Sequence, residues 1–213
     1  MLFRSDLLAQ AVFAREPQVQ GEEIVTLMEM TLKNLTSEGG LDYKDFLERV
    51  DLLGSLGQTV VISNYGEFYR LAGYLFRYTK KKIGLVMGVP TLQKLFEEQY
   101  YTDLEGGILE SFGRMFKNGL RLYVYPYRDP ASGALISADN MLVKPHLRHL
   151  YAYLIENLHI QGLRDYHEAC LPIFSHEVLA LIRQGDPRWE SMVPPKVAGL
   201  IKKIGRASCR ERV

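Results

Sequence analysis

Three short clusters of polar and glycine residues follow uncharged, apolar segments of the chain. In an open α/β sheet, ligands bind at the carboxyl ends of the strands, where backbone N–H groups and helix N-termini attract anions. Serine and asparagine offer neutral hydrogen-bonding groups, glycine permits close approach of the backbone, and arginine pairs with phosphate or carboxylate. We therefore expect a small phosphorylated ligand to bind at Ser63, Asn64, Tyr65, Gly66, Gly88, Thr91, Arg128 and Asp129.

Ordinary turn chemistry is a competing explanation for the first of these clusters. The run Ser-Asn-Tyr-Gly at 63–66 is also typical of turns and helix caps. The pair Gly106-Gly107 precedes an expected helix and has the composition of a phosphate cradle, but neither GxGxxG nor GxxxxGK[ST] is present. We interpret this pair as a site of close helix packing.

The histidines and Cys170 do not form a metal-binding or nucleophile motif. The histidines, which lack the spacing of a zinc site, are His146, His149, His159, His167 and His176. We interpret them as surface or capping residues. Cys170 has no nucleophile motif around it, and neither GxSxG nor a paired-carboxylate signature occurs in the sequence. The sequence therefore predicts no metal site and leaves the catalytic residues unassigned.

A run of positive charge lies between an expected helix end and an expected strand start, at Arg77, Lys80, Lys81 and Lys82. Cations at this position oppose the negative end of the helix dipole. The run belongs to the edge of the sheet opposite the expected ligand face, so we interpret it as a solvated turn. We expect no nucleic-acid partner, because the chain is not basic overall and the alternating Tyr123, Tyr125 and Tyr127 are typical of a packed strand face.

Residues 58–140 are expected to form an α/β core. The β-branched run at 58–64 predicts a strand that is buried on both faces, and 67–79 predicts an amphipathic helix. With a strand at 82–89, these segments predict a right-handed βαβ unit. The remaining expected elements are helices at 91–100 and 105–117 and a third strand at 120–127 that ends near Pro126. A polar loop is expected at 128–140. This alternation predicts a Rossmann-like, open, mostly parallel sheet of few strands flanked by helices.

The two flanking regions are expected to be helical. In residues 6–57, the spacing of apolar residues predicts a helix at 20–35 that stops at Gly39-Gly40, and a second helix at 42–56 that Asp42 caps. In residues 141–203, it predicts helices that pack back on the core and no further strand; these helices are at 145–157, 175–185 and 195–203.

Both ends of the chain have the sequence of translated adapter DNA. Residues 204–213 read IGRASCRERV, and residues 1–5 end in LFRS. Such segments are excluded from fold reasoning. Without them the formal net charge changes from +1 to −2, because Arg4 and the terminal Arg206, Arg210, Arg212 and Glu211 are removed.

The composition is that of a globular protein, with 47% hydrophobic and 24% charged residues. No apolar run approaches the roughly 20 residues that a membrane helix needs, so we expect no membrane partner. Without the adapter segments Cys170 is the remaining cysteine, and no secretion signal or lipidation motif is present. We therefore expect a cytoplasmic location.

Residues 63–129, from SNYGEFYRLAG to LYVYPYRD, closely resemble a bacterial family of larger proteins. The likeness extends from about Arg15 to Lys203 and includes WESMVPPKVAGLIKK. In that family this region is the C-terminal part, which implies that a native N-terminal domain is missing here. Family members carry two conflicting labels, nicotinamide-nucleotide adenylyltransferase and TonB-dependent receptor. We reject the receptor label, because such receptors need many alternating strands of about ten residues.

The adenylyltransferase label implies a Rossmann-like sheet that binds ATP at its strand ends. The HxGH and ISSTxxR-type motifs of that class do not occur here, so no catalytic residue is transferred from it. A fainter resemblance is to haloacid-dehalogenase-type phosphatases, in which a helix leads into an apolar strand as LLGSLGQTVVISN does. Their DxDx[TV] nucleophile motif is also absent, which is consistent with a catalytically silent relative.

These observations lead to two functional hypotheses of different classes. The first is a cytoplasmic Rossmann-like domain that handles a nucleotide or phosphorylated small molecule. If that domain is an enzyme, the resemblance implies nicotinamide-nucleotide adenylyl transfer, with ATP and Mg²⁺ as the expected cofactors. The alternative is a non-enzymatic interaction or regulatory module, or a silent phosphatase-like domain.

Overall fold

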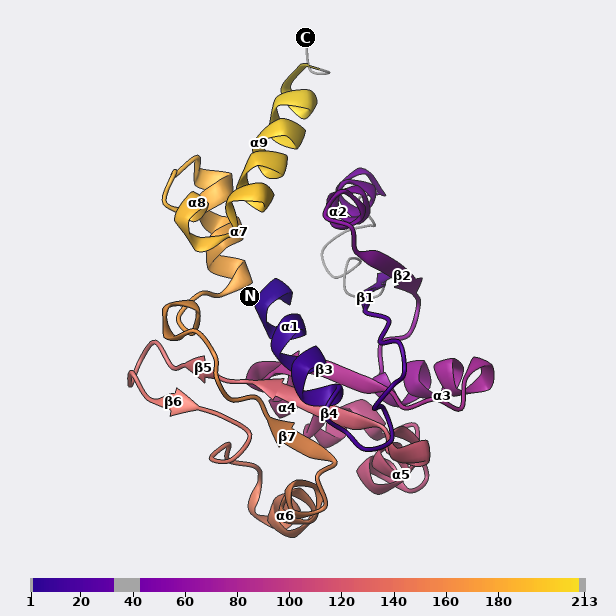
Figure 1. Cartoon of the computed structure of the whole chain (residues 1–213). Coiled ribbons are helices and arrows are strands. Elements are labelled where there is room, and N and C mark those ends of the chain that lie inside the picture. The colour runs from indigo at the N-terminus through magenta and orange to yellow at the C-terminus, as the bar shows by residue number, and fades with distance from the viewer. Residues whose placement is uncertain (1, 33–42, 211–213) are drawn as a thin grey trace. The chain divides into compact units, whose positions relative to one another are not determined.

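The computed structural model describes residues 2–32 and 43–210 of the chain (Figure 1). Contacts between residues divide the chain into two compact units, and each unit combines segments that are distant in the sequence. The first unit contains Val25–Gly66 and Ile173–Val213, and the second contains Leu2–Ile24 and Glu67–Pro172. The expected C-terminal segment 141–203 therefore contributes to both units.

A parallel sheet is the centre of the second unit. Its strand order is β3 (Gly84–Gly88), β4 (Arg121–Tyr125) and β7 (Ile160–Gly162), so β4 lies in the middle. The register pairs Gly88 with Tyr125 and Val124 with Gly162. Four consecutive residues of β4, from Leu122 to Tyr125, are buried. This is expected of a central parallel strand that is covered on both faces.

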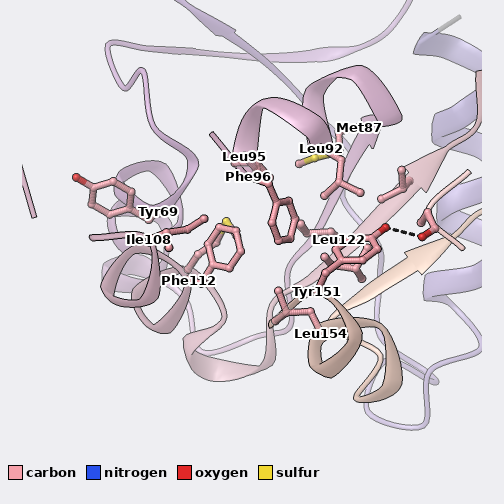
Figure 2. Close-up of a cluster of buried hydrophobic side chains, with 14 of the residues drawn as sticks. Tyr69, Met87, Leu92, Leu95, Phe96, Ile108, Phe112, Leu122, Tyr151 and Leu154 are labelled. Atoms are coloured by element: carbon pink, nitrogen blue, oxygen red, sulfur yellow. Dashed lines mark hydrogen bonds between the residues drawn. The ribbon is translucent and has the colours of Figure 1, made fainter. Parts of the chain in front are cut away.

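Helices cover both faces of this sheet (Figure 1). Leu122 and Val124 belong to a large apolar cluster with residues of α3, α4, α5 and α6, which Figure 2 shows around Phe96 and Phe112. Tyr123 and Tyr125 point to the opposite face and pack with Ala9 of α1. The helices are α1 (Leu2–Phe13), α3 (Phe68–Tyr78), α4 (Val89–Leu95), α5 (Gly107–Met115) and α6 (Arg148–Glu156).

Short elements complete the second unit. An antiparallel hairpin of two-residue strands, β5 (Tyr127–Arg128) and β6 (Leu135–Ile136), follows β4 after Pro126. The 3-10 turns are η2 (Glu98–Tyr101), η3 (Lys117–Gly119), η4 (Pro145–Leu147) and η5 (Glu168–Cys170).

The first unit contains a two-stranded parallel sheet, formed by β1 (Leu27–Thr31) and β2 (Thr59–Ser63). Its helices are α2 (Tyr43–Ser55), α7 (Ser175–Gln184), α8 (Trp189–Met192) and α9 (Pro195–Arg210). A small apolar cluster joins α7, α8 and α9 through Val178, Trp189 and Ala198. Trp189 is buried and contributes the aromatic ring of this cluster.

The expected fold class is confirmed, because open, mostly parallel small sheets alternate with helices and the C-terminal part is largely helical. The strands expected at 58–64, 82–89 and 120–127 are β2, β3 and β4. Burial of Tyr123 and Tyr125 also confirms the interpretation of this strand face as packed. Tyr127 is not part of that face, because it lies in β5 and packs against the large apolar cluster instead. Pro126 ends β4, as expected of a residue without a backbone donor.

The helix expected at 20–35 is wrong, because β1 occupies Leu27–Thr31 and pairs with β2. Over only five residues, the apolar Leu27, Met28 and Met30 fit helical spacing as well as strand spacing. Parallel pairing with β2 satisfies the backbone donors and acceptors and decides for the strand. Asp42 and the pair Gly39-Gly40 lie outside the described residues.

The expected βαβ unit is also wrong, because β2 pairs with β1 whereas β3 pairs with β4 in another sheet. The expectation that β2 is buried on both faces is wrong too, since Thr59 and Ile62 are exposed. A run of β-branched residues indicates a strand but does not specify its partner.

The sequence missed β7 in the C-terminal region and the hairpin β5–β6 in the expected polar loop 128–140. These strands have only two or three residues each, which is too short for a periodic pattern. β7 nevertheless completes the second unit's sheet on the side of β4 opposite β3.

Candidate functional site

The carboxyl edge of the second unit's sheet is the place where a parallel sheet most often binds ligands. The three strands end there at Gly88, Tyr125 and Gly162. Glycine therefore ends both outer strands, and the central strand ends at a buried tyrosine. We call this region the carboxyl edge.

Gly88 and Thr91 lie at the carboxyl edge, as expected from the sequence. Gly88 is the N-cap of α4, so strand and helix follow each other without an intervening loop. A Cβ atom at Gly88 would lie 3.5 Å from Cδ of Pro90 and 4.0 Å from the carbonyl oxygen of Tyr125, which are ordinary contacts. The fold therefore tolerates a small side chain here, and Thr91, which is half-buried, lies in the first turn of the helix.

The segment 137–140 lies beside the end of β7. A Cβ atom at Gly162 would be 3.6 Å from Oδ2 of Asp139, and the same oxygen is 3.8 Å from Nη2 of Arg164. The hydroxyl group of Tyr151 on α6 donates a hydrogen bond to the carbonyl oxygen of Ala138 and holds this segment. Burial is the main cause that raises the pKa of Tyr151, so the phenol stays protonated as a donor.

Asp139 and Arg164 are the site residues that sequence reasoning missed. Arg164 follows β7, whose three residues gave no strand signal, and Asp139 lies in the expected polar loop. Arg164 is 85% exposed, and a solvent-exposed ion pair contributes little to stability. Its guanidinium is therefore accessible to an incoming anion.

Arg128 and Asp129 belong to the hairpin β5–β6. Nη1 of Arg128 donates a hydrogen bond to the carbonyl oxygen of Gly133 at 3.0 Å. The Asp129 carboxylate accepts bonds from the Ser132 backbone N–H at 2.9 Å and from the Ser132 hydroxyl at 2.5 Å. These bonds stabilise the charged carboxylate and lower the pKa of Asp129. Both residues thus hold the turn that follows the edge of the sheet.

The other four expected residues, 63–66, lie in the first unit at the end of β2. The Ser63 hydroxyl donates to Oε1 of Glu29 and accepts a bond from the Tyr65 backbone N–H at 3.2 Å. The Thr31 hydroxyl donates to the carbonyl oxygen of Tyr65 at 2.9 Å. Ser63 and Tyr65 therefore attach the exit of β2 to β1, while Asn64 and Gly66 are exposed.

The pair Gly106-Gly107 forms the entrance of α5. The backbone N–H of Gly106 donates to Oε2 of Glu110 at 2.9 Å, which satisfies a donor at the helix start. Gly107 has a φ angle of +53°, a conformation that favours glycine. The geometry thus accounts for both glycines through the local structure of the helix entrance.

Neither a cluster of metal ligands nor a membrane helix was found in the described ranges 2–32 and 43–210. In these ranges no three His, Cys, Asp or Glu side chains are grouped so that they could hold a metal ion. Likewise, none of the described helices is long and apolar enough to cross a membrane.

Comparison with known proteins returned no protein-family model, no curated protein and no solved structure that matches this chain. The structure itself defines an α/β protein whose second unit contains a three-stranded parallel sheet.

Proposed function

We propose that the second unit is a Rossmann-like domain that binds a nucleotide or another phosphorylated small molecule at its carboxyl edge. The observation that supports this proposal most is the common edge at which β3, β4 and β7 end. Gly88 and Gly162 end the two outer strands, on either side of the central strand. The position agrees with the general location of ligands in open parallel sheets.

We propose that Arg164 is the residue that binds the phosphate group of the ligand. A phosphate oxygen bound to its guanidinium forms a charge-assisted hydrogen bond, which is stronger than a bond between neutral groups. Asp139 is the partner of this guanidinium in the structure, at 3.8 Å. A dianionic phosphate competes with a single carboxylate for the same cation, so ligand binding replaces one ion pair with another.

Adenylyl transfer to nicotinamide mononucleotide is the specific activity that the family resemblance adds to this proposal. ATP would be the nucleotide substrate, and Mg²⁺ would accompany its phosphates. In the described ranges no three His, Cys, Asp or Glu side chains are grouped as metal ligands, so Asp129 and Asp139 do not form a protein-bound Mg²⁺ site. We therefore derive no reaction step through a metal, and assign binding rather than catalysis to the named residues.

A binding titration tests the proposal. We expect Arg164→Gln to weaken the binding of ATP by about tenfold or more, because it removes a charged donor without a large change in volume. Arg114→Gln is the matched control, since Arg114 is also an exposed arginine paired with a carboxylate, Glu110, at 2.5 Å. Calorimetry of both variants and the parent chain measures the effect.

Equal affinities of the two variants would contradict the assignment of Arg164, and absence of ATP binding to the parent chain would contradict the proposal itself. A separate assay mixes the chain with ATP, magnesium and nicotinamide mononucleotide and follows NAD formation. ATP binding without NAD formation would favour the alternative hypothesis, in which the domain is a binding or regulatory module.

A further inference from the structure

A pocket lies at the opposite, amino edge of the same sheet, and the proposed function does not use it. Lys82 precedes β3, Gly119 and Arg121 begin the β4 region, and His159 precedes β7. The volume of the pocket is about 110 Å³. Because drug-sized ligands occupy pockets of roughly 300–1,000 Å³, this pocket fits an ion or a very small molecule and not a nucleotide.

Among the residues that the structure describes, one cation of the pocket has no acidic partner. Glu16 forms an ion pair with Arg121, and its Oε1 atom also accepts bonds from the Tyr123 hydroxyl at 3.0 Å and from Nε2 of Gln161 at 3.4 Å. Glu16 therefore balances the charge of Arg121. The Lys82 ammonium donates to the carbonyl oxygen of Asn118 at 3.3 Å, and no carboxylate of the described ranges lies within ion-pair distance of it.

The Lys82 ammonium lies against Gly119. Gly119 has a φ angle of +70°, and a Cβ atom at this position would be only 2.3 Å from Nζ of Lys82. The ammonium thus occupies the space that a side chain at position 119 would fill. It lies over the backbone of the turn that leads into β4, and the pocket is lined by this turn.

His159 adds a neutral polar group to the pocket. Burial and the positive charge of Arg121 lower the pKa of its imidazole. At neutral pH the ring therefore donates or accepts a hydrogen bond without adding charge.

The guanidinium of Arg121 has five N–H donors, more than its contact with Glu16 uses.

We propose that this amino-edge pocket binds a small oxyanion of the size of inorganic phosphate. The Lys82 ammonium supplies the unbalanced positive charge, and Arg121 and His159 supply directed donors. Glu16, which also lines the pocket, pairs with the guanidinium and fixes it, so the donors are oriented before the ion arrives. The site is separate from the carboxyl edge, and it stands whether or not a nucleotide binds there.

A titration with potassium phosphate at constant ionic strength tests this site, observed through the backbone NMR signals of the full chain. We expect saturable shifts at Gly119, Arg121 and His159. We expect Lys82→Gln to weaken phosphate binding by about tenfold or more, because it removes the unbalanced charge. Lys81→Gln is the matched control: it removes the same charge from the neighbouring lysine, which pairs with Glu22 at 2.5 Å and does not line the pocket. The control is expected to bind within about twofold of the parent chain.

Three outcomes would overturn the proposal: shifts that do not saturate, shifts confined to residues outside the pocket, or equal weakening by the two lysine variants. Equal weakening would show that phosphate responds only to net charge. The Arg164→Gln variant separates this test from that of the proposed function. We expect it to bind phosphate at the amino edge as the parent chain does, so failure at one edge does not imply failure at the other.

Discussion

His159 shows how the fold changes the chemistry of a single residue. From the sequence, we interpreted the histidines as surface or capping residues. The structure instead places the ring of His159 against the Phe116 ring, with 4.9 Å between the ring centroids. Burial is the first cause that lowers the pKa of His159, and the charge of Arg121 is the second. Both causes disfavour the charged imidazolium.

We predict that Arg121→Gln raises the pKa of His159, because the substitution removes the positive charge and leaves Glu16 nearby. The pKa is measured from the NMR shifts of the imidazole protons as a function of pH. Arg148→Gln is the control, since the Arg148 side chain contacts His149 instead. An unchanged pKa in Arg121→Gln would mean that burial alone causes the shift.

At the scale of elements, β4 is the strand on which the second unit depends. Its odd and even residues enter different apolar clusters, one beneath α3, α4, α5 and α6 and the other against α1. It also pairs with both other strands of the sheet. Loss of a side chain from β4 therefore removes contacts with several elements at once.

We predict that Leu122→Ala lowers the free energy of unfolding by about 2–5 kcal/mol, because it leaves a cavity at a fully buried position. Leu142→Ala is the control; Leu142 is 90% exposed, and its truncation should change the free energy by less than about 0.5 kcal/mol. Urea-induced unfolding, followed by circular dichroism, measures both values. A similar loss in the two variants would contradict the central position of β4.

At the scale of the whole molecule, buried phenol groups make the free energy of unfolding depend on pH in the alkaline range. Burial is the main cause that raises the pKa of Tyr101, to about 12, and it also raises the pKa values of Tyr123 and Tyr151. The Tyr101 hydroxyl donates to the carbonyl oxygen of Leu95 at 2.8 Å, and the Tyr123 hydroxyl donates to Glu16 at 3.0 Å. A phenolate would lose these donated bonds.

These raised pKa values predict that the protein loses stability as the pH rises above about 10, the ordinary pKa of tyrosine. The unfolded chain releases phenol protons at that pH while the folded chain retains them, so deprotonation favours unfolding. The contribution of these tyrosines to the free energy of unfolding is fully present below about pH 10. It is lost as the pH approaches the raised pKa values of the folded protein. Urea unfolding between about pH 9 and pH 11 measures the effect. A constant free energy over this range would contradict the prediction.

The sequence located most of the elements correctly. The strands β2, β3 and β4 and the helices α2, α3, α5 and α7 lie where apolar periodicity predicted them. Periodicity succeeds for such segments because several consecutive residues report on the same buried face. It failed for β7, which has three residues, and for Leu27–Thr31, where five residues fit both helix and strand.

The candidate site was predictable only in part. The position of Gly88 and Thr91 at the carboxyl edge was predictable, because the sequence shows a strand that is followed directly by a helix. Arg128 and Asp129 are used in a hairpin whose two-residue strands have no pattern. Arg164 and Asp139 come from segments that flank missed strands, so no sequence signal associated them.

By itself, the sequence determined the α/β class and the position of its longer strands and helices, because periodicity and turn composition are local properties. Only the tertiary structure decided which strands pair and which charges meet. β2 pairs with β1 rather than with β3, and Glu16 bonds Arg121, 105 residues further along the chain. Pairing and charge contacts form between residues that are distant in the sequence. Their partners are therefore selected by how the whole chain packs.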